Sequence, residues 1–434
     1  MGTGKVGPRV RGISIRERQA ERVAEAFASL PGRYRGGAPG FRATYEIRLG
    51  DIGRLWEIRL GTERCVVRPS ASGDPNVVIG TDARTWLALR EGRLSGLDAF
   101  SAGRLYVRGD LDLALGFEGL FELPGGRPPL VRIDGLDTAA GRISAVVSGT
   151  GPEHVVCLHG LGSGKISFFE TISALAPDLT VHAIDLPGFG SSAKPVRASY
   201  DARYFAGATA AYMDAAGVER AHLVGNSMGG RAAVELGLRE PDRVASLSLL
   251  CPALAFRRRR ELVPLVKLLR PELAALPHPM RSALVRSQLA AMFARPERLD
   301  PATTEVVTEE FCRAYRSRAV RVAFYAAARS IYLDAPWGPN GLWDRLAKLE
   351  PPALFVWGDS DRFVPAAFSR HVDRALPAAQ QVVLADCGHV PQVELPAETN
   401  RLVRSHIDDN SAQPEPVPAP RRLARRPLRL ARAA

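Results

Sequence analysis

The stretch "LVGNSMGGRAAV" (residues 223–234) places a serine between two glycines at a point where the residue pattern changes. An apolar run leads into Ser227, and a helix-like run leaves it. Glycines at positions 225 and 229 remove side chains that would collide in a sharp strand-to-helix turn, and such a turn lifts a serine hydroxyl clear of a sheet. The pattern predicts a nucleophilic serine, and a serine with a purely structural place in a turn is the alternative. The predicted nucleophile elbow comprises Gly225, Asn226, Ser227 and Gly229.

A serine hydroxyl becomes a competent nucleophile only when a base takes its proton. His389 in "DCGHVPQVELP" follows the last β-rich run, and its glycine and proline neighbours favour an exposed, shaped loop. His389 is therefore the predicted base. The remaining histidines are weaker candidates for the base, because they begin a strand, lie inside a strand, lie in the glycine-rich loop "LHGLGSGK" or lie in helical surroundings. They are His154, His159, His182, His222, His278, His371 and His406.

A histidine base needs a carboxylate that fixes its tautomer and stabilises its protonated form. The segment "VWGDSDRFVP" supplies Asp359 and Asp361 after the penultimate β-rich run, and the residues by themselves leave both open. The aspartate that does not serve the histidine is expected to cap the backbone of its own turn.

Two backbone N–H groups are needed to stabilise the oxyanion of an acyl-transfer reaction. Met228, the residue after the nucleophile, supplies one, and Leu161 in "LHGLGSGK" supplies the other. Glycines in this loop let the backbone approach a substrate closely. His159, which precedes them, is predicted to be a structural loop residue. This chemistry requires neither a metal nor an organic cofactor, so none is predicted.

The elements that must position these residues begin at Val131, where short β-rich runs alternate with longer helical stretches. Several runs are almost continuously apolar, as in strands buried on both faces of a parallel sheet. The alternation predicts a doubly wound α/β domain, in which ligands bind beyond the carboxyl ends of the strands. The β-rich runs are "EHVVCLHG", "LTVHAIDLPG", "AHLVGNS", "VASLSLLCPA", "PALFVWGDS" and "QQVVLADCG".

On these motifs, residues 131–408 resemble the α/β-hydrolase superfamily, whose triad follows the chain order Ser, Asp, His. The family pattern "WGxxD", matched at Gly358, implies that Asp361 rather than Asp359 is the triad acid. The combination of "GNSMGG" and "DLPGFG" is most similar to the branch that holds carboxylesterases, lipases and carbon–carbon hydrolases of ring-cleavage products. The resemblance also implies that the helical insertion at about 252–347 forms a lid. Within it, the charge run Arg257–Arg260 is expected to be a solvated face or to meet an anionic group.

These residues lead us to expect a serine hydrolase that cleaves a hydrophobic carboxylic ester, with a lipid-like or sterol-like portion, through an acyl-enzyme. A carbon–carbon hydrolase of ring-cleavage products is the alternative, because it would use the same triad. An alternative of another class is a lipid carrier in which the hydrolase region is vestigial.

The N-terminal region combines alternating strand patterns, such as "FRATYEIRL" and "RLWEIRLG", with helical stretches, which predicts a smaller α+β domain. Thr81 is predicted to cap the helix in "DARTWLALREG". The order of these elements up to "GRLYVRGDLDLAL" resembles the sterol-carrier-protein 2 lipid-transfer domain over residues 1–125. The resemblance implies an apolar tunnel for a fatty-acyl or sterol ligand, with a closed core as the alternative. The segment "ELPGGRPPL" (residues 122–130) is the predicted seam between the two domains.

The totals are those of a multidomain globular chain: 434 residues, net charge +12 and no apolar run of about 18 residues. The N-terminal residues show no apolar signal region, and five scattered cysteines favour a reducing, cytoplasmic setting. The tail 411–434, with six arginines and one acidic residue, is predicted to be disordered. It is either simply solvated or makes weak, peripheral contact with an anionic membrane. No aromatic residues interleave with these arginines, so nucleic-acid binding is not expected.

Overall fold

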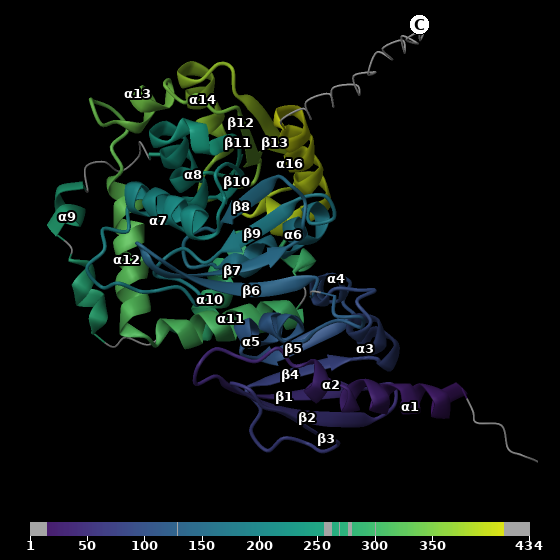
Figure 1. The fold of residues 1–434 in the computed structure, drawn as a ribbon. Helices are drawn as coiled ribbons and strands as arrows, with labels where there is room; N and C mark the ends of the chain where they lie inside the picture. The colour runs from purple at the N-terminus through teal and green to yellow at the C-terminus, as the bar shows by residue number, and fades with distance from the viewer. Residues whose placement is uncertain are drawn as a thin grey trace, which may run out of the picture.

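The computed structural model describes residues 15–127, 129–255, 263–268, 270–276, 280–299 and 301–411. Two bodies are stacked, with the smaller N-terminal domain beneath the larger one in Figure 1. The arginine run 257–260, His278 and the basic tail beyond residue 411 lie outside the described residues.

The N-terminal domain is built on a five-stranded sheet with the order β3-β2-β1-β4-β5. The central strands β1 and β4 are parallel, and the other neighbours are antiparallel. Alternate residues of β1, from Ala43 to Leu49, are buried on the face that the helices cover, as the period-2 pattern predicts. The strands are β1 (Arg42–Leu49), β2 (Arg54–Gly61), β3 (Cys65–Arg68), β4 (Val77–Thr81) and β5 (Leu105–Gly109).

Aromatic side chains join the sheet to its helices. The ring of Phe27 stacks on Trp56 at 4.1 Å and on Trp86 at 4.5 Å between centroids. The prediction that Thr81 caps the next helix is wrong, because Thr81 ends β4 and the Asp82 carboxylate accepts the capping hydrogen bond from the Thr85 amide. The helices are α1 (Ile15–Ala28), α2 (Leu30–Arg33), α3 (Ala83–Arg90), α4 (Gly96–Ser101) and α5 (Leu111–Gly116).

The larger domain contains an eight-stranded sheet with the order β13-β12-β11-β10-β8-β9-β7-β6. The six strands predicted from apolar runs form its parallel part. The antiparallel pair β6 and β7 was not predicted. Strand β6 is only partly buried and lacks a continuous apolar run, whereas β7 is buried and its apolar residues Ala145–Val147 were missed. The strands are β6 (Val131–Thr138), β7 (Gly141–Ser148), β8 (His154–Leu158), β9 (Thr180–Ile184), β10 (Ala221–Asn226), β11 (Val244–Leu250), β12 (Ala353–Gly358) and β13 (Gln380–Leu384).

Helices cover both faces of this sheet. The first face packs against α7 (Ala202–Ala215), α8 (Met228–Arg239) and α14 (Ser369–Ala375). The second face packs against α6 (Phe169–Leu175) and α16 (Pro396–Asn410). Shorter elements are α15 (Pro391–Glu394) and the 3₁₀ turns η1 (Glu118–Leu120), η2 (Lys165–Phe168), η3 (Pro241–Arg243) and η7 (Ala366–Phe368).

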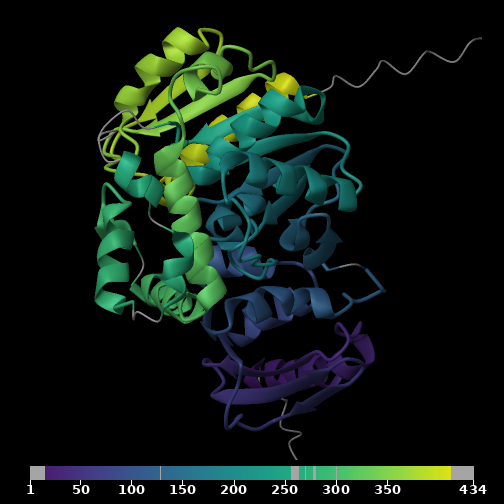
Figure 2. The same cartoon turned by 90° about the vertical axis from the view of Figure 1, so that its left-hand side faces the viewer.

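A helical insertion follows β11 and stands beside the sheet in Figure 2. Its helix α11 also contacts β5 of the N-terminal domain. The last helix of the predicted lid segment, α13 (Leu342–Leu346), packs instead on α8 and α14, and so belongs to the main body. The other elements are α9 (Val263–Leu268), η5 (Pro271–Ala275), α10 (Ser282–Ala291), η6 (Pro296–Arg298), α11 (Pro301–Tyr315) and α12 (Arg318–Leu333).

Among the described residues, no helix combines the length and apolar character needed to cross a bilayer. All five cysteines are free thiols.

Candidate active site

Ser227 lies in the sharp turn between β10 and α8. Its backbone has φ 52° and ψ −113°, a conformation that is strained for a residue with a side chain. A β-carbon at Gly225 would lie 2.7 Å from Gly229 backbone atoms, and one at Gly229 would lie 2.0 Å from the Leu158 carbonyl oxygen. The two glycines therefore permit the close backbone approach that this turn requires.

The structure brings Ser227, His389 and Asp361 together from three separate strand ends. His389 Nε2 lies 2.9 Å from Ser227 Oγ, and Nδ1 lies 2.7 Å from Asp361 Oδ2. Because a carboxylate only accepts, Nδ1 carries the proton and Nε2 is left to accept from the serine hydroxyl. The second carboxylate oxygen, Oδ1, accepts from the amides of Phe363 at 2.7 Å and Val364 at 2.9 Å, which fixes the orientation of Asp361.

Asp359 lies outside this relay. Its carboxylate accepts from the amide of Asp386 at 3.2 Å, the amide of Cys387 at 3.3 Å and the hydroxyl of Ser360 at 2.9 Å. Burial alone would raise the pKa of Asp359, but these hydrogen bonds outweigh it and lower the pKa below its usual value. Asp359 thus ties its turn to the loop that carries the histidine.

The loop after β8 passes directly beside Ser227, since a β-carbon at Gly160 would lie 3.4 Å from Ser227 Cβ. Leu161 is the next residue along this loop after Gly160. Met228 is the first residue of α8, so its N–H has no acceptor within the helix. The amides of Leu161 and Met228 therefore belong to the two chain segments that flank the Ser227 hydroxyl.

His159 holds this loop in place. Its Nδ1 donates to the Gly160 carbonyl at 2.7 Å, and its Nε2 accepts from the Leu186 amide at 2.9 Å. Burial lowers the pKa of His159, although Asp185 opposes that shift. The neutral ring links two backbone loops, which is a structural task.

Asn226 makes a contact that the motif did not specify. Its side-chain amide donates to the carbonyl oxygens of Leu250 at 3.1 Å and His389 at 3.0 Å. The residue before the nucleophile therefore fixes the backbone of the histidine loop.

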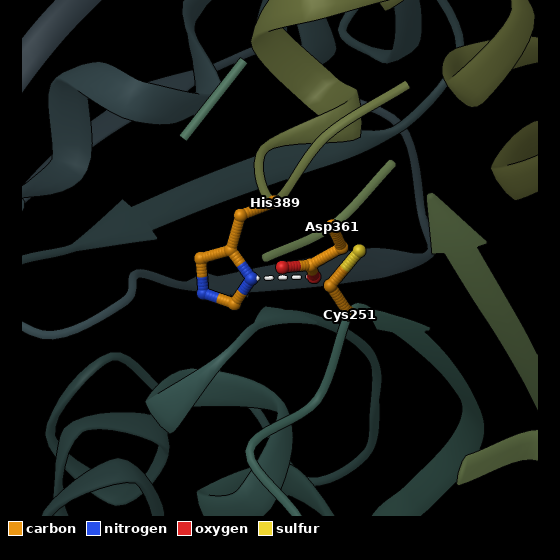
Figure 3. A group of neighbouring side chains, drawn as sticks. All are labelled: Cys251, Asp361 and His389. Atoms are coloured by element: carbon orange, nitrogen blue, oxygen red, sulfur yellow. Dashed lines mark hydrogen bonds and ion pairs between the residues drawn. The ribbon is translucent and has the colours of Figure 1, made fainter. Parts of the chain in front are cut away.

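Cys251 was not singled out from the sequence, yet it lies against the triad. Its thiol is grouped with Asp361 and His389, with ligand atoms within 4.8 Å of one another (Figure 3). Burial first, and the nearby Asp361 second, raise the pKa of the Cys251 thiol well above its usual value. A neutral thiol is a poor metal ligand, and the His389 nitrogen that faces this group already donates to Asp361. These contacts favour a triad over a metal centre.

The helical insertion packs against two loops of the site. A β-carbon at Gly162 would lie 2.9 Å from the Phe324 ring and 3.1 Å from the Phe311 ring. On the other side, the His389 amide donates to the Met292 carbonyl at 2.6 Å. The insertion thus touches both the loop after β8 and the histidine loop, and it brings aromatic side chains to the former.

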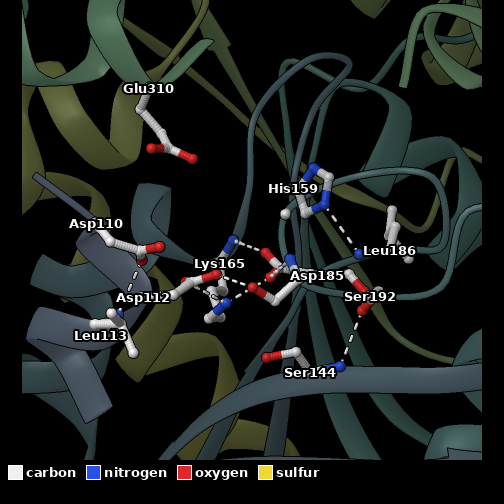
Figure 4. A network of polar contacts seen from close by, with 12 residues as sticks. Asp110, Asp112, Leu113, Ser144, His159, Lys165, Asp185, Leu186, Ser192 and Glu310 are labelled. Atoms are coloured by element: carbon white, nitrogen blue, oxygen red, sulfur yellow. Dashed lines mark hydrogen bonds and ion pairs between the residues drawn. The ribbon is translucent and has the colours of Figure 1, made fainter. Parts of the chain in front are cut away.

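A buried ion network joins this region to the N-terminal domain (Figure 4). Lys165, 1% exposed, lies 2.5 Å from Asp185 and 2.7 Å from Asp112 of α5. Asp112 also accepts from the Ser191 hydroxyl. Burial alone would raise the pKa of Asp112, but the Lys165 ammonium outweighs it and lowers the pKa. The ion pair therefore links α5 to Lys165, which follows the loop that contains Leu161.

Comparison with known proteins identifies the families of the two domains. Residues 153–396 match the model of the alpha/beta hydrolase fold family. The chain belongs to the α/β-hydrolase fold family. Residues 29–122 of this hydrolase match the SCP-2 sterol transfer family. The expected architecture, an α/β hydrolase preceded by a smaller sterol-carrier-like domain, is confirmed.

Individual relatives of this hydrolase differ in their chemistry. A 2-hydroxy-6-oxononadienedioate/2-hydroxy-6-oxononatrienedioate hydrolase from Paraburkholderia phymatum is 30% identical, over 59% of this chain and 87% of the relative. The dihydrolipoyllysine-residue acetyltransferase component of the acetoin cleaving system of Cupriavidus necator is 32% identical, over 61% of this chain but only 66% of the relative. A solved structure, a membrane phospholipase A described as a bacterial virulence factor, is 29% identical with a TM-score of 0.54, and covers 64% of this chain and 86% of that one. Family membership supports hydrolase activity without specifying the bond.

Proposed function

We propose that the chain is a serine hydrolase that cleaves a hydrophobic carboxylic ester through an acyl-enzyme. The observation that carries the proposal is the unbroken relay from Ser227 through His389 to Asp361, with contacts of 2.9 and 2.7 Å. Both distances are within the reach that proton transfer requires.

In this mechanism Ser227 Oγ attacks the substrate carbonyl while His389 Nε2 takes the hydroxyl proton. Asp361 keeps the imidazole oriented and stabilises its protonated form. The amides of Leu161 and Met228 donate to the oxyanion of the tetrahedral intermediate. His389 then returns the proton to the leaving alcohol, and the same steps with water release the acid and restore Ser227.

The hydrophobic character of the substrate is supported by the cover of the site and by the N-terminal domain. Phe311 and Phe324 pack over the loop after β8. The similarity to the SCP-2 sterol transfer family supports binding of a hydrophobic ligand in the same chain. We propose that residues 1–125 supply or concentrate such a ligand for the hydrolase domain.

Carbon–carbon cleavage of a ring-cleavage product is the second candidate. A relative that is 30% identical over 87% of its length carries the name of such a hydrolase. The same triad serves both reactions, so the two candidates are distinguished by which type of substrate the chain turns over faster.

The test compares purified full-length chain on p-nitrophenyl esters of increasing acyl length and on 2-hydroxy-6-oxo-6-phenylhexa-2,4-dienoate. Faster turnover of the esters, as kcat/KM, supports the first proposal, and faster turnover of the dienoate supports the second. A fluorophosphonate probe should label Ser227 in either case. Failure of the probe and of both substrate types would leave a lipid carrier with a vestigial hydrolase domain.

A further inference from the structure

The oxyanion loop, residues 160–164 with Leu161 in it, continues directly into the contact between the two domains. Lys165 follows this loop and begins η2. Its ammonium is buried and lies 2.5 Å from Asp185 and 2.7 Å from Asp112, and Figure 4 shows it between these two carboxylates. Asp185 belongs to the hydrolase domain, whereas Asp112 belongs to α5 of the N-terminal domain. Since a buried ammonium is costly without nearby anions, both domains contribute to the position of Lys165.

The Asp185 carboxylate also binds the backbone where the oxyanion loop ends. Its Oδ1 accepts from the Lys165 amide at 2.8 Å, and its Oδ2 accepts from the Ser191 amide at 2.9 Å. A β-carbon at Gly164 would lie 3.0 Å from Asp185 Oδ1, so the loop passes close to this carboxylate. The Ser191 hydroxyl donates to Asp112. One connected set of polar contacts therefore joins the end of the oxyanion loop to α5.

Apolar side chains that follow the loop extend the contact between the domains. Ile166, next to Lys165, packs against the apolar cores of both domains. The Phe169 ring meets the Phe100 ring of α4 edge-on, with 6.3 Å between the centroids. Leu97 of α4 is buried in the same apolar cluster as Phe169. A shift of the N-terminal domain would therefore displace the segment into which the oxyanion loop continues.

Helix α11 of the insertion provides a second connection between the N-terminal domain and the oxyanion loop. A β-carbon at Gly162 of the loop would lie 3.1 Å from the Phe311 ring of this helix. Arg313 of the same helix lies 3.9 Å from Asp110, the N-cap of α5, and α11 also contacts β5. The N-terminal domain thus reaches the loop directly through Lys165 and indirectly through α11.

We propose that the N-terminal domain has a second task, which is to position the oxyanion loop, with Asp112 as a positioning residue. The inference rests on the proposed function, because it takes the Leu161 amide as an oxyanion donor. It differs from ligand supply, since positioning also affects substrates that are too small and soluble to need a carrier. Asp112 touches no reacting atom and acts through Lys165. Loss of one oxyanion donor lowers kcat by about 10²–10³-fold, so a partial displacement of Leu161 should be measurable.

The experiment compares kcat and KM of the full-length wild type and Asp112→Asn on p-nitrophenyl acetate, a small soluble ester. Asparagine keeps the shape of the side chain and removes the charge that faces Lys165. We expect kcat to fall about tenfold and KM to change by less than about twofold, because an oxyanion donor acts on the transition state. If the wild type turns over only the dienoate, the same comparison is made on that substrate.

The matched control is Asp134→Asn in the hydrolase domain. The Asp134 side chain is 31% exposed, close to the 32% of Asp112, and pairs with Arg132 of its own strand. The control makes the same chemical change without touching the contact between the domains, so kcat and KM should stay at the wild-type values.

Inhibition by a trifluoromethyl ketone distinguishes positioning of the loop from a general loss of structure. Ser227 Oγ adds to its carbonyl carbon, the hydroxyl proton passes to His389, and the new oxyanion takes the place of the one in the reaction. The inhibition constant should rise in Asp112→Asn by the factor by which kcat falls, below the thermal midpoint of the variant. Phe100→Leu, which weakens the contact with Phe169, should change both quantities in the same directions.

Unchanged kcat and inhibition constants in both Asp112→Asn and Phe100→Leu would overturn the positioning task. A rise in KM at unchanged kcat would also overturn it, because the contact would then serve substrate binding. Either result, obtained with an active wild type, leaves the proposed hydrolase function intact. A wild type that turns over neither the ester nor the dienoate would instead reject the proposed function, and the positioning task with it.

Discussion

The Ser227 site and the Arg90 cavity, a small cavity lined by Arg90, Trp86 and Glu118, differ in whether their buried polar atoms have hydrogen-bond partners. At the Ser227 site both nitrogens of His389 and both oxygens of Asp361 have partners. In the cavity, donors of Arg90 and Trp86 have none among the described residues. The first site is complete before its substrate arrives, as electrostatic preorganisation requires. The second leaves buried donors without partners among the described residues.

This difference separates a preorganised catalytic site from a region whose buried donors have no partners. Preorganised catalytic groups gain little further stability when the substrate binds, because their hydrogen bonds already exist. Substitutions at the two regions should therefore change different observables.

The largest expected effect is on turnover. Ser227→Ala removes the nucleophile and should lower kcat by about 10⁶-fold, while the thermal midpoint stays near that of the wild type. Steady-state assays with the preferred ester and a melting curve check both parts. Activity within about tenfold of wild type would remove Ser227 from the mechanism and erase the contrast between the two regions.

The next effect separates the two aspartates after β12. Asp361→Asn should lower kcat by about 10⁴-fold, because an amide favours the wrong histidine tautomer. Asp359→Asn should lower kcat far less, since this carboxylate serves backbone amides. If the ranking of kcat is reversed, Asp359 is the triad acid in solution.

A third test concerns the fully partnered ion network between the domains. Asp185→Asn leaves the buried Lys165 with weaker compensation and should lower the free energy of unfolding by about 3–5 kcal/mol. Asp112→Asn should cost less, since Asp112 is 32% exposed and Asp185 remains to pair with the lysine. Urea unfolding of both variants gives the ranking, and equal stability of Asp185→Asn and wild type would contradict it.

The smallest effects are on the pH dependence of stability, and they should have opposite signs in the two domains. Burial lowers the pKa of His182 and His222 to about 4, so their stabilisation is present above about pH 6.5 and is lost as the pH falls towards 4. Burial raises the pKa of Glu118 to about 7, so its stabilisation is present below about pH 4.5 and is lost as the pH rises through 7.

Each group should contribute at most about 3 kcal/mol. Thermal midpoints measured between pH 4 and 8 check this. His182→Gln should reduce the change of the midpoint with pH at acidic pH, and Glu118→Gln should reduce that change near neutral pH. A Glu118→Gln profile that matches the wild type would show that this carboxyl is not buried in solution.

The candidate catalytic residues were accessible to sequence reasoning because each lies in a local pattern that follows a strand. Ser227 is marked by its glycines, and His389 and the two aspartates stand in short loops after apolar runs. The choice of Asp361 over Asp359 required family resemblance, because two aspartates two residues apart look alike until their hydrogen bonds are known.

What sequence reasoning missed depends on contacts between distant segments. Lys165 and Asp112 lie 53 positions apart in different domains, and no local pattern marks them as partners. Arg90 looks like an ordinary cation near a helix end in the sequence, yet it is buried beside the rings of Trp86, Phe117 and Phe121. Cys251 reads as one of several scattered cysteines. Local periodicity determines helices and strands, whereas burial and pairing across domains follow from the assembled fold.

Strand β6 is one of the two outermost strands of the eight-stranded sheet, and α5 and η1 of the N-terminal domain contact it. An outermost strand presents unpaired backbone groups on which a second chain can assemble into aggregates. Ribosomes make the N-terminal domain first, and domains generally fold as units during synthesis. The elements that contact β6 are therefore synthesised before β6 leaves the ribosome. With the reverse order of the two domains, β6 would be synthesised before those elements existed.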